Sequence, residues 1–115
     1  MKKNALFAFN GDFMCFIHVL LNALELKEKG HEVKIVIEGA ATKLIPELKK
    51  KDNPLHALYQ KAKDSGLFDG VCKACSNKMG TLEAAGAEGF KLLDDMFGHP
   101  GMAGYIEKGF EIITF

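Results

Sequence analysis

The chain has 115 residues, of which 48% are hydrophobic and 10% aromatic, so it is long enough to bury the core of one domain. Its 15 Lys and Arg residues balance its 15 Asp and Glu residues. This balance argues against a nucleic-acid partner, because such proteins carry a net basic surface. Three cysteines are too few, and odd in number, for a disulfide framework, so we expect a reducing compartment.

The first residues imitate a secretory signal, because the basic residues of Met1–Lys3 precede an apolar stretch. However, Asn10–Asp12 divides that stretch, and no small-residue cleavage site follows it. The second apolar part, Phe13–Leu24, is too short to span a bilayer and contains His18 and Asn22. We therefore expect a cytoplasmic protein without a membrane partner.

The N-terminal third predicts a strand, a long helix and a second strand. Ala5–Phe9 is a continuous apolar run, which is typical of a buried parallel strand. Asp12 is a natural N-cap for the helix that follows, and Gly30 ends that helix. His31–Ile37 is rich in β-branched residues and predicts the second strand, which completes a βαβ unit.

The long helix is apolar on almost every side. Its polar positions recur three or four residues apart in one narrow stripe: Cys15, His18, Asn22, Glu25 and Lys29. A helix this apolar buries a second face, so we expect residues 12–29 to lie at a contact between subunits of a homo-oligomer. The alternative is that a loop of the same chain covers the helix.

The rest of the chain also alternates between helix and strand. Strands are expected at Leu67–Cys72, Phe90–Leu93 and Phe110–Phe115. Helices are expected within Thr42–Lys51, from Asn53 to Gly66, after Cys72, within Thr81–Gly89 and from His99 to about Lys108. We therefore predict one α/β domain over residues 1–115, with a flavodoxin-like, mostly parallel open sheet of about five strands and helices on both faces.

The run from Val71 to Gly80, VCKACSNKMG, places two cysteines three residues apart where a strand meets a helix. If Cys72 ends the strand and Cys75 lies in the first helical turn, both sulfurs face the positive end of the helix dipole. Lys73 and Lys78 add positive charge nearby, which favours a thiolate. The alternative is that both cysteines fill the core as small apolar side chains.

Ligands of open parallel sheets bind at the carboxyl ends of the strands, near the point where the strand order reverses. We expect the first and third strands to flank that point. The loops after them would then bring all three cysteines together, with His99 beside them if the fourth strand forms. The residues expected to line this site are Asn10, Gly11, Asp12, Cys15, Lys73, Lys78 and His99.

Three functions fit this pattern. In the first, Cys72 is a nucleophile that accepts and passes on sulfur as a persulfide. In the second, Cys72 and Cys75 form a reversible disulfide, although the sequence lacks the aromatic and proline residues around a thioredoxin CxxC. In the third, a non-catalytic binding or regulatory module holds zinc between Cys15, His18, Cys72 and Cys75, a ligand set of the Cys3His type. No serine-hydrolase elbow, P-loop or dinucleotide fingerprint is present, so no cofactor is expected.

Several of these features recur together in one group of proteins: the apolar first strand, the long helix followed by Lys29–Val33, the terminal Ile112–Phe115, and Val71-Cys72-x-Ala74-Cys75 with Gly80 eight residues after Cys72. Over nearly its whole length the chain resembles the DsrE/DsrF-like (YchN-like, TusD-related) family of small sulfur-relay proteins. The resemblance implies a flavodoxin-like subunit that forms trimers or hexamers. It also implies transfer of persulfide sulfur between a donor protein and an acceptor protein.

Carried over by position, the resemblance makes Cys72 the sulfur acceptor of a sulfurtransferase-like carrier and Cys75 a second thiol. The segment Ser76–Met79 departs from the family pattern, in which an arginine commonly precedes the glycine. Lys78 supplies a positive charge there but not the planar guanidinium group.

Overall fold

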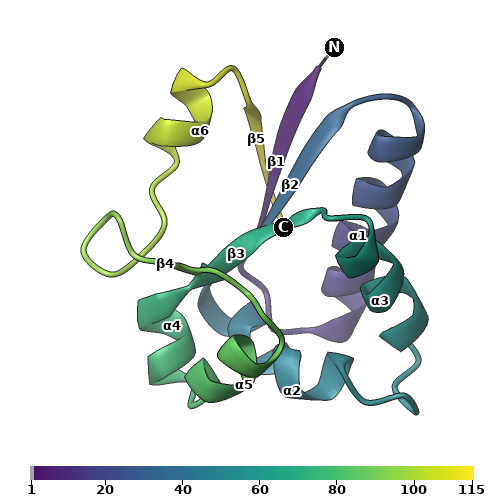
Figure 1. The fold of residues 1–115 in the computed structure, drawn as a ribbon, viewed down its shortest axis with the longest axis vertical. Coiled ribbons are helices and arrows are strands. Elements are labelled where there is room, and N and C mark those ends of the chain that lie inside the picture. The colour runs from purple at the N-terminus through teal and green to yellow at the C-terminus, as the bar shows by residue number, and fades with distance from the viewer. Residues whose placement is uncertain (1) are drawn as a thin grey trace.

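Five strands form the centre of the structure, in the spatial order β4-β3-β2-β1-β5 (Figure 1). The computed structural model describes residues 2–115. The strands are β1 (Lys3–Ala8), β2 (Glu32–Ile37), β3 (Phe68–Cys72), β4 (Leu92–Leu93) and β5 (Glu111–Thr114). Every neighbouring pair is parallel. The prediction of a flavodoxin-like α/β sheet of about five strands is confirmed.

Helical segments connect these strands. They are α1 (Phe13–Glu28), the 3-10 helix η1 (Gly39–Leu44), α2 (Ile45–Leu48), α3 (His56–Asp64), α4 (Lys73–Lys78), α5 (Leu82–Ala87) and α6 (Ala103–Glu107). The Asp12 side chain caps α1 by accepting a hydrogen bond from the backbone N–H of Met14, and Gly30 follows the helix with a φ of +89°. Both predicted ends of α1 are therefore confirmed.

The strand order corrects one expectation. The second strand, β2, lies between β1 and β3, so the first and third strands are not neighbours. The order reverses between β1 and β5, because β5 returns to the far side of β1. The segment that follows β2 therefore lies between the segments that follow β1 and β3.

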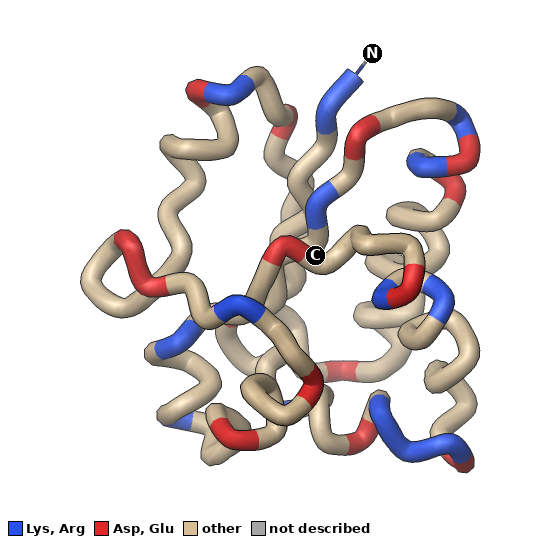
Figure 2. The backbone as a smooth tube through the Cα atoms, in the orientation of Figure 1, with Lys and Arg blue, Asp and Glu red and all other residues tan. Residues whose placement is uncertain are grey.

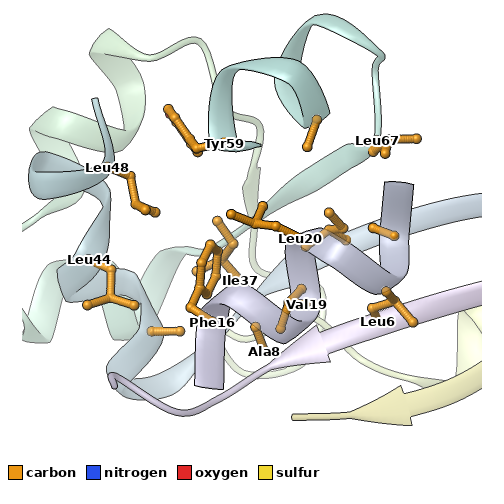
Figure 3. Packing of buried hydrophobic residues seen from close by; sticks show 14 of the residues in the cluster. Leu6, Ala8, Phe16, Val19, Leu20, Ile37, Leu44, Leu48, Tyr59 and Leu67 are labelled. Carbon is orange, nitrogen blue, oxygen red and sulfur yellow. The ribbon is translucent and has the colours of Figure 1, made fainter. Parts of the chain in front are cut away.

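The larger core lies on the face of the sheet that α1 and α3 cover (Figure 3). Phe16, Val19 and Leu20 of α1 pack there with Leu6 and Ala8 of β1, and all five side chains are almost fully buried. The intervening side chains of β1 point to the opposite face, as the two-residue period of a strand requires.

A smaller core covers that opposite face. Phe7 of β1 packs there with Val36 of β2 and with Phe110, which precedes β5. The Tyr105 ring of α6 meets the Phe7 ring edge to face, with 5.4 Å between the ring centroids. In Figure 1, α6 lies on the opposite side of the sheet from α1 and α3. The prediction of helices on both faces is therefore confirmed.

One side of α1 remains apolar and uncovered in the single chain. Met14 is 78% exposed and Leu21 45% exposed, while the half-buried Ile17 and Leu24 lie at helical spacing from them. No helix among residues 2–115 combines the length and the apolar character needed to cross a bilayer.

Positive and negative residues are mixed along the backbone (Figure 2). The longest basic run, residues 49–51, directly follows α2, and acidic residues 47 and 52 flank it. This mixing agrees with the formal net charge of zero.

Candidate functional site

Four side chains with metal-ligating or nucleophilic atoms converge at the carboxyl ends of β2, β3 and β4. Glu38 directly follows β2, Cys72 ends β3, Cys75 lies in the first turn of α4, and His99 follows β4. One ligand atom from each of the four lies within 4.8 Å of the others. Parallel strands end at the same edge of a sheet, so the order β4-β3-β2 brings these segments together.

Cys72 is the N-cap residue of α4, and its Sγ accepts a hydrogen bond from the backbone N–H of Cys75 at 3.3 Å. The Cys72 side chain is 0% exposed. The pKa of Cys72 is raised to about 12, chiefly by burial; the Cys75 amide opposes this shift, whereas the Cys75 thiol and the Glu38 carboxyl group add to it. The expectation of an exposed, ionised thiol at Cys72 is therefore wrong, because its desolvation outweighs the field of the helix terminus.

His99 connects the two cysteines. Its Nδ1 atom lies 3.1 Å from Cys72 Sγ and 3.5 Å from Cys75 Sγ. The same nitrogen lies 3.9 Å from a carboxylate oxygen of Glu38. Burial raises the pKa of Glu38, although its interactions with Cys72 and His99 work in the opposite direction. One imidazole nitrogen thus contacts a buried thiol, a partly buried thiol and a buried carboxyl group.

A tight hairpin holds His99 in place. Met96 and His99 form an antiparallel bridge, with N–O distances of 2.7 and 2.9 Å. The bridge keeps His99 out of α6, so the helix predicted from His99 begins only at Ala103. At the turn, Phe97 has a φ of +51° and its side chain is fully exposed. A bulky residue in this left-handed region is strained, so the surrounding contacts must hold the turn.

One of those contacts joins the hairpin to α4. The carbonyl oxygen of Gly98 accepts a hydrogen bond from the Ala74 backbone N–H at 2.9 Å, and Cys72 Sγ lies 3.8 Å from the same oxygen. The segment before His99 is therefore fixed to the helix that carries Cys75.

The cluster borders an open hollow. Glu38 and His99 form part of the wall of a cavity of about 500 Å³. Its other lining residues are mostly apolar: Phe9, Met96, Pro100, Met102 and Ala103. Small ligands can therefore approach the cluster from the side of the imidazole and the carboxyl group.

The loop after β1 is engaged in local contacts. The Asn10 side chain accepts a hydrogen bond from the Asp12 backbone N–H, and Asp12 caps α1. A Cβ atom on Gly11 would lie 2.8 Å from the carbonyl oxygen of Ala40, so this glycine permits a close backbone approach. These residues, which we expected to line the site, are not members of the four-residue cluster.

Four other predicted residues also lie outside the cluster. Cys15 is partly buried and His18 exposed on α1, so the zinc set of Cys15, His18, Cys72 and Cys75 is not assembled. Lys73 is exposed and lies 3.7 Å from Asp94 in an ion pair, and Lys78 is exposed in the last turn of α4. Of the residues predicted to line the site, His99 joins the two CxxC cysteines.

Glu38 is the member of the cluster that was not predicted from the sequence. The available signal was its position, because it is the first residue after a buried β-branched run. That position is the carboxyl end of a parallel strand, where ligand-binding residues are common. The strand order was needed to place it beside Cys72.

Comparisons with known proteins find archaeal relatives. The uncharacterized protein MJ0733 of Methanocaldococcus jannaschii is 39% identical over 97 residues, which cover 84% of this chain and 77% of the relative. The chain belongs to the family of this protein. An uncharacterized protein of Archaeoglobus fulgidus is 54% identical over 41 residues, which cover 36% of this chain and 67% of the relative. No protein-family profile and no solved structure matches the chain.

Proposed function

We propose that the protein is a sulfur-relay protein that carries sulfane sulfur on Cys72 and Cys75. One observation carries this proposal: a partly buried thiol and a fully buried thiol share one imidazole nitrogen, at 3.5 and 3.1 Å. The resemblance to DsrE/DsrF-like proteins at Val71–Gly80 supports it. Both archaeal relatives are uncharacterized, so they neither support nor oppose the proposal.

Sulfur enters on Cys75, because its thiol is more accessible than that of Cys72. His99 takes the thiol proton, and the Cys75 thiolate attacks the outer sulfur of a donor persulfide, R–S–SH. A new S–S bond forms to Cys75 while the donor's S–S bond breaks. The donor leaves as a thiolate that takes the proton back from His99, so no oxidant or reductant is consumed.

Cys72 then stores the sulfur. Its sulfur attacks the outer sulfur of the Cys75 persulfide, and Cys75 leaves as a thiolate. Both sulfurs lie within the 4.8 Å cluster, and His99 Nδ1 is near enough to accept the Cys72 proton. The high pKa of Cys72 makes this step slower than the first. A persulfide at a fully buried position is protected from solvent thiols.

Intact-protein mass spectrometry tests the proposal after incubation of the reduced, metal-free protein with inorganic polysulfide. We expect sulfur-sized mass increments in the wild-type protein and in the matched control Cys15→Ser. The increments are lost in Cys75→Ser, whereas Cys72→Ser still gains them but releases them faster to added thiol. Increments that persist in the Cys72→Ser/Cys75→Ser double variant, or none in the wild type, contradict sulfur carriage on this pair.

A second function, reversible disulfide formation, is favoured by the proximity of the same two sulfurs. A disulfide between Cys72 and Cys75 forms by exchange with a disulfide of a substrate, which is reduced to two thiols, so this chain loses two hydrogens and gains no sulfur. The mass spectrum therefore distinguishes it from persulfide formation. A fall in mass, reversed by a reductant and absent from either single cysteine variant, supports thiol–disulfide exchange.

We further propose that the protein self-associates and passes sulfur between a donor and an acceptor protein in the cytoplasm. The uncovered apolar side of α1 supports self-association. The three cysteines are free, as sulfur exchange in a reducing compartment requires.

A further inference from the structure

We infer that Glu38, Cys72, Cys75 and His99 form a four-coordinate site for a thiophilic divalent cation of the Zn²⁺ class. This inference goes beyond sulfur carriage and stands on the geometry of the cluster alone. The ligand set differs from the one considered from the sequence, since a carboxylate and His99 replace Cys15 and His18.

The donor atoms match the preferences of Zn²⁺. The cluster offers two sulfurs, one imidazole nitrogen and one carboxylate oxygen. Zn²⁺ is bound in proteins by these ligand types, most often four at a time in a tetrahedron. Mg²⁺ and Ca²⁺ prefer oxygen ligands and waters, so two thiolates discriminate against both.

The spacing of the donor atoms also fits. Zn–S bonds of about 2.3 Å and Zn–N bonds of about 2.0 Å, at tetrahedral angles, place a sulfur and a nitrogen about 3.5 Å apart. The measured distances from His99 Nδ1 are 3.1 Å to Cys72 Sγ and 3.5 Å to Cys75 Sγ. The distance from Nδ1 to Glu38 Oε1 is 3.9 Å. Nitrogen and oxygen ligands at about 2.0 Å are about 3.3 Å apart in the same geometry, so each of the three measured distances lies within about 0.6 Å of its tetrahedral value. All four donor atoms lie within 4.8 Å of one another.

The backbone already holds the ligands close to these positions. The Glu38 N–H donates to the Ala8 carbonyl oxygen at 2.8 Å, which ties Glu38 to the sheet. Cys72 ends β3, and the hairpin that carries His99 is bonded to α4. The Cys75 N–H also donates to Cys72 Sγ, a contact that stabilises a metal-bound thiolate. Pre-organised ligands lower the conformational entropy that metal binding must overcome.

The cluster lacks a permanent positive charge. Glu38 is 6% exposed, and among residues 2–115 its one ion-pair partner is His99, which is charged only when protonated. A buried carboxylate without a cation is unfavourable, because desolvation penalises its charge. A divalent cation would compensate that charge and could enter through the hollow beside Glu38 and His99.

Titration of the reduced, metal-free protein with Co²⁺ tests this inference. Co²⁺ prefers similar ligands and, unlike Zn²⁺, has visible absorption bands that report its geometry and a thiolate charge-transfer band that reports sulfur ligation. We expect one Co²⁺ per chain, with intense tetrahedral bands and the charge-transfer band, and displacement of Co²⁺ by one equivalent of Zn²⁺. Cys15→Ser and His18→Ala, outside the cluster, should give the same titration.

Glu38→Gln removes one ligand, so it should weaken Co²⁺ binding by at least about tenfold while the thiolate charge-transfer band remains. The band should disappear in Cys72→Ser/Cys75→Ser. Because Cys72 is buried, far-ultraviolet circular dichroism must first show that this double variant folds. If the double variant does not fold, the Co²⁺ affinity of Glu38→Gln still tests the inference. Absence of the band from the wild type, or equal Co²⁺ affinity in Glu38→Gln, overturns the inference. Neither result affects sulfur uptake, which is measured without metal.

Discussion

At the scale of single residues, the contact with His99 favours a chemical function for the two cysteines over a purely structural one. A CxxC pair alone is compatible with a core position, and Cys72 is indeed fully buried. The imidazole nitrogen at 3.1 and 3.5 Å from the two sulfurs provides a proton acceptor for either thiol. The imidazole is itself partly exposed and can exchange protons with solvent.

Replacement of His99 by alanine should slow sulfur uptake from polysulfide by about 100-fold, because general-base catalysis of this kind contributes about 10²–10⁴-fold. Time-resolved mass spectrometry measures the rate, and His18→Ala is the control because His18 is exposed and outside the cluster. An unchanged rate in His99→Ala would show that solvent, not the imidazole, accepts the proton. The rate should recover partly as the pH rises, because hydroxide can then replace the imidazole as the proton acceptor.

At the scale of elements, a small polar network joins α3 to the end of α5. The Tyr59 hydroxyl donates a hydrogen bond to the Glu88 carboxylate, and Lys63 Nζ lies 3.3 Å from the same carboxylate. Partial burial works to raise the pKa of Glu88, but the hydrogen bonds from Tyr59 and Lys63 prevail and lower it. Because α5 follows the cysteine helix, this network also helps to fix the position of α4.

We predict that Glu88→Gln destabilises the protein by about 1–3 kcal/mol at neutral pH, the usual effect of weakening a partly buried hydrogen bond to a charged group. The pKa of Glu88 is lower in the folded protein than in the unfolded chain, where it is about 4.3. Glu88 therefore stabilises the fold fully above the unfolded-state pKa, and this contribution is lost as the pH falls through the lower, folded-state pKa. Urea unfolding at a series of pH values should therefore show a smaller acid-induced loss of stability in the variant. Glu111→Gln, which changes an exposed carboxyl group of β5, should match the wild type at every pH.

At the scale of the whole molecule, the two long sides of α1 have different surroundings. Phe16, Val19 and Leu20 contribute to the larger core, whereas Met14 and Leu21 face outward. The outward residues lie seven apart and therefore on the same side of the helix. This apolar side is the surface that we expect a second copy of the chain to cover.

Multi-angle light scattering at micromolar concentration should return a mass above that of one chain for the wild type. Met14→Lys/Leu21→Lys should shift the mass toward the monomer, because two buried charges oppose association. Met79→Lys, a similar change at an exposed methionine beyond α4, is the control and should leave the mass unchanged. A monomeric wild type contradicts the expectation.

Local sequence patterns determined the alternation of strands and helices, the N-cap at Asp12, the glycine stop at Gly30 and the strand-to-helix junction at Cys72. These features depend on residues within a few positions of each other, so composition and spacing encode them. The position of His99 near the cysteines also followed from the strand pattern.

Only the tertiary structure decided which segments meet at the site. Strand order depends on pairing between residues far apart in the chain, and it places Glu38, rather than the loop after β1, beside Cys72. Burial of the Cys72 thiol is equally non-local, because α4 and the hairpin before His99 exclude solvent from it. The sequence therefore identified Cys72, Cys75 and His99, whereas their protonation and their contact with Glu38 depend on long-range packing that no local pattern encodes.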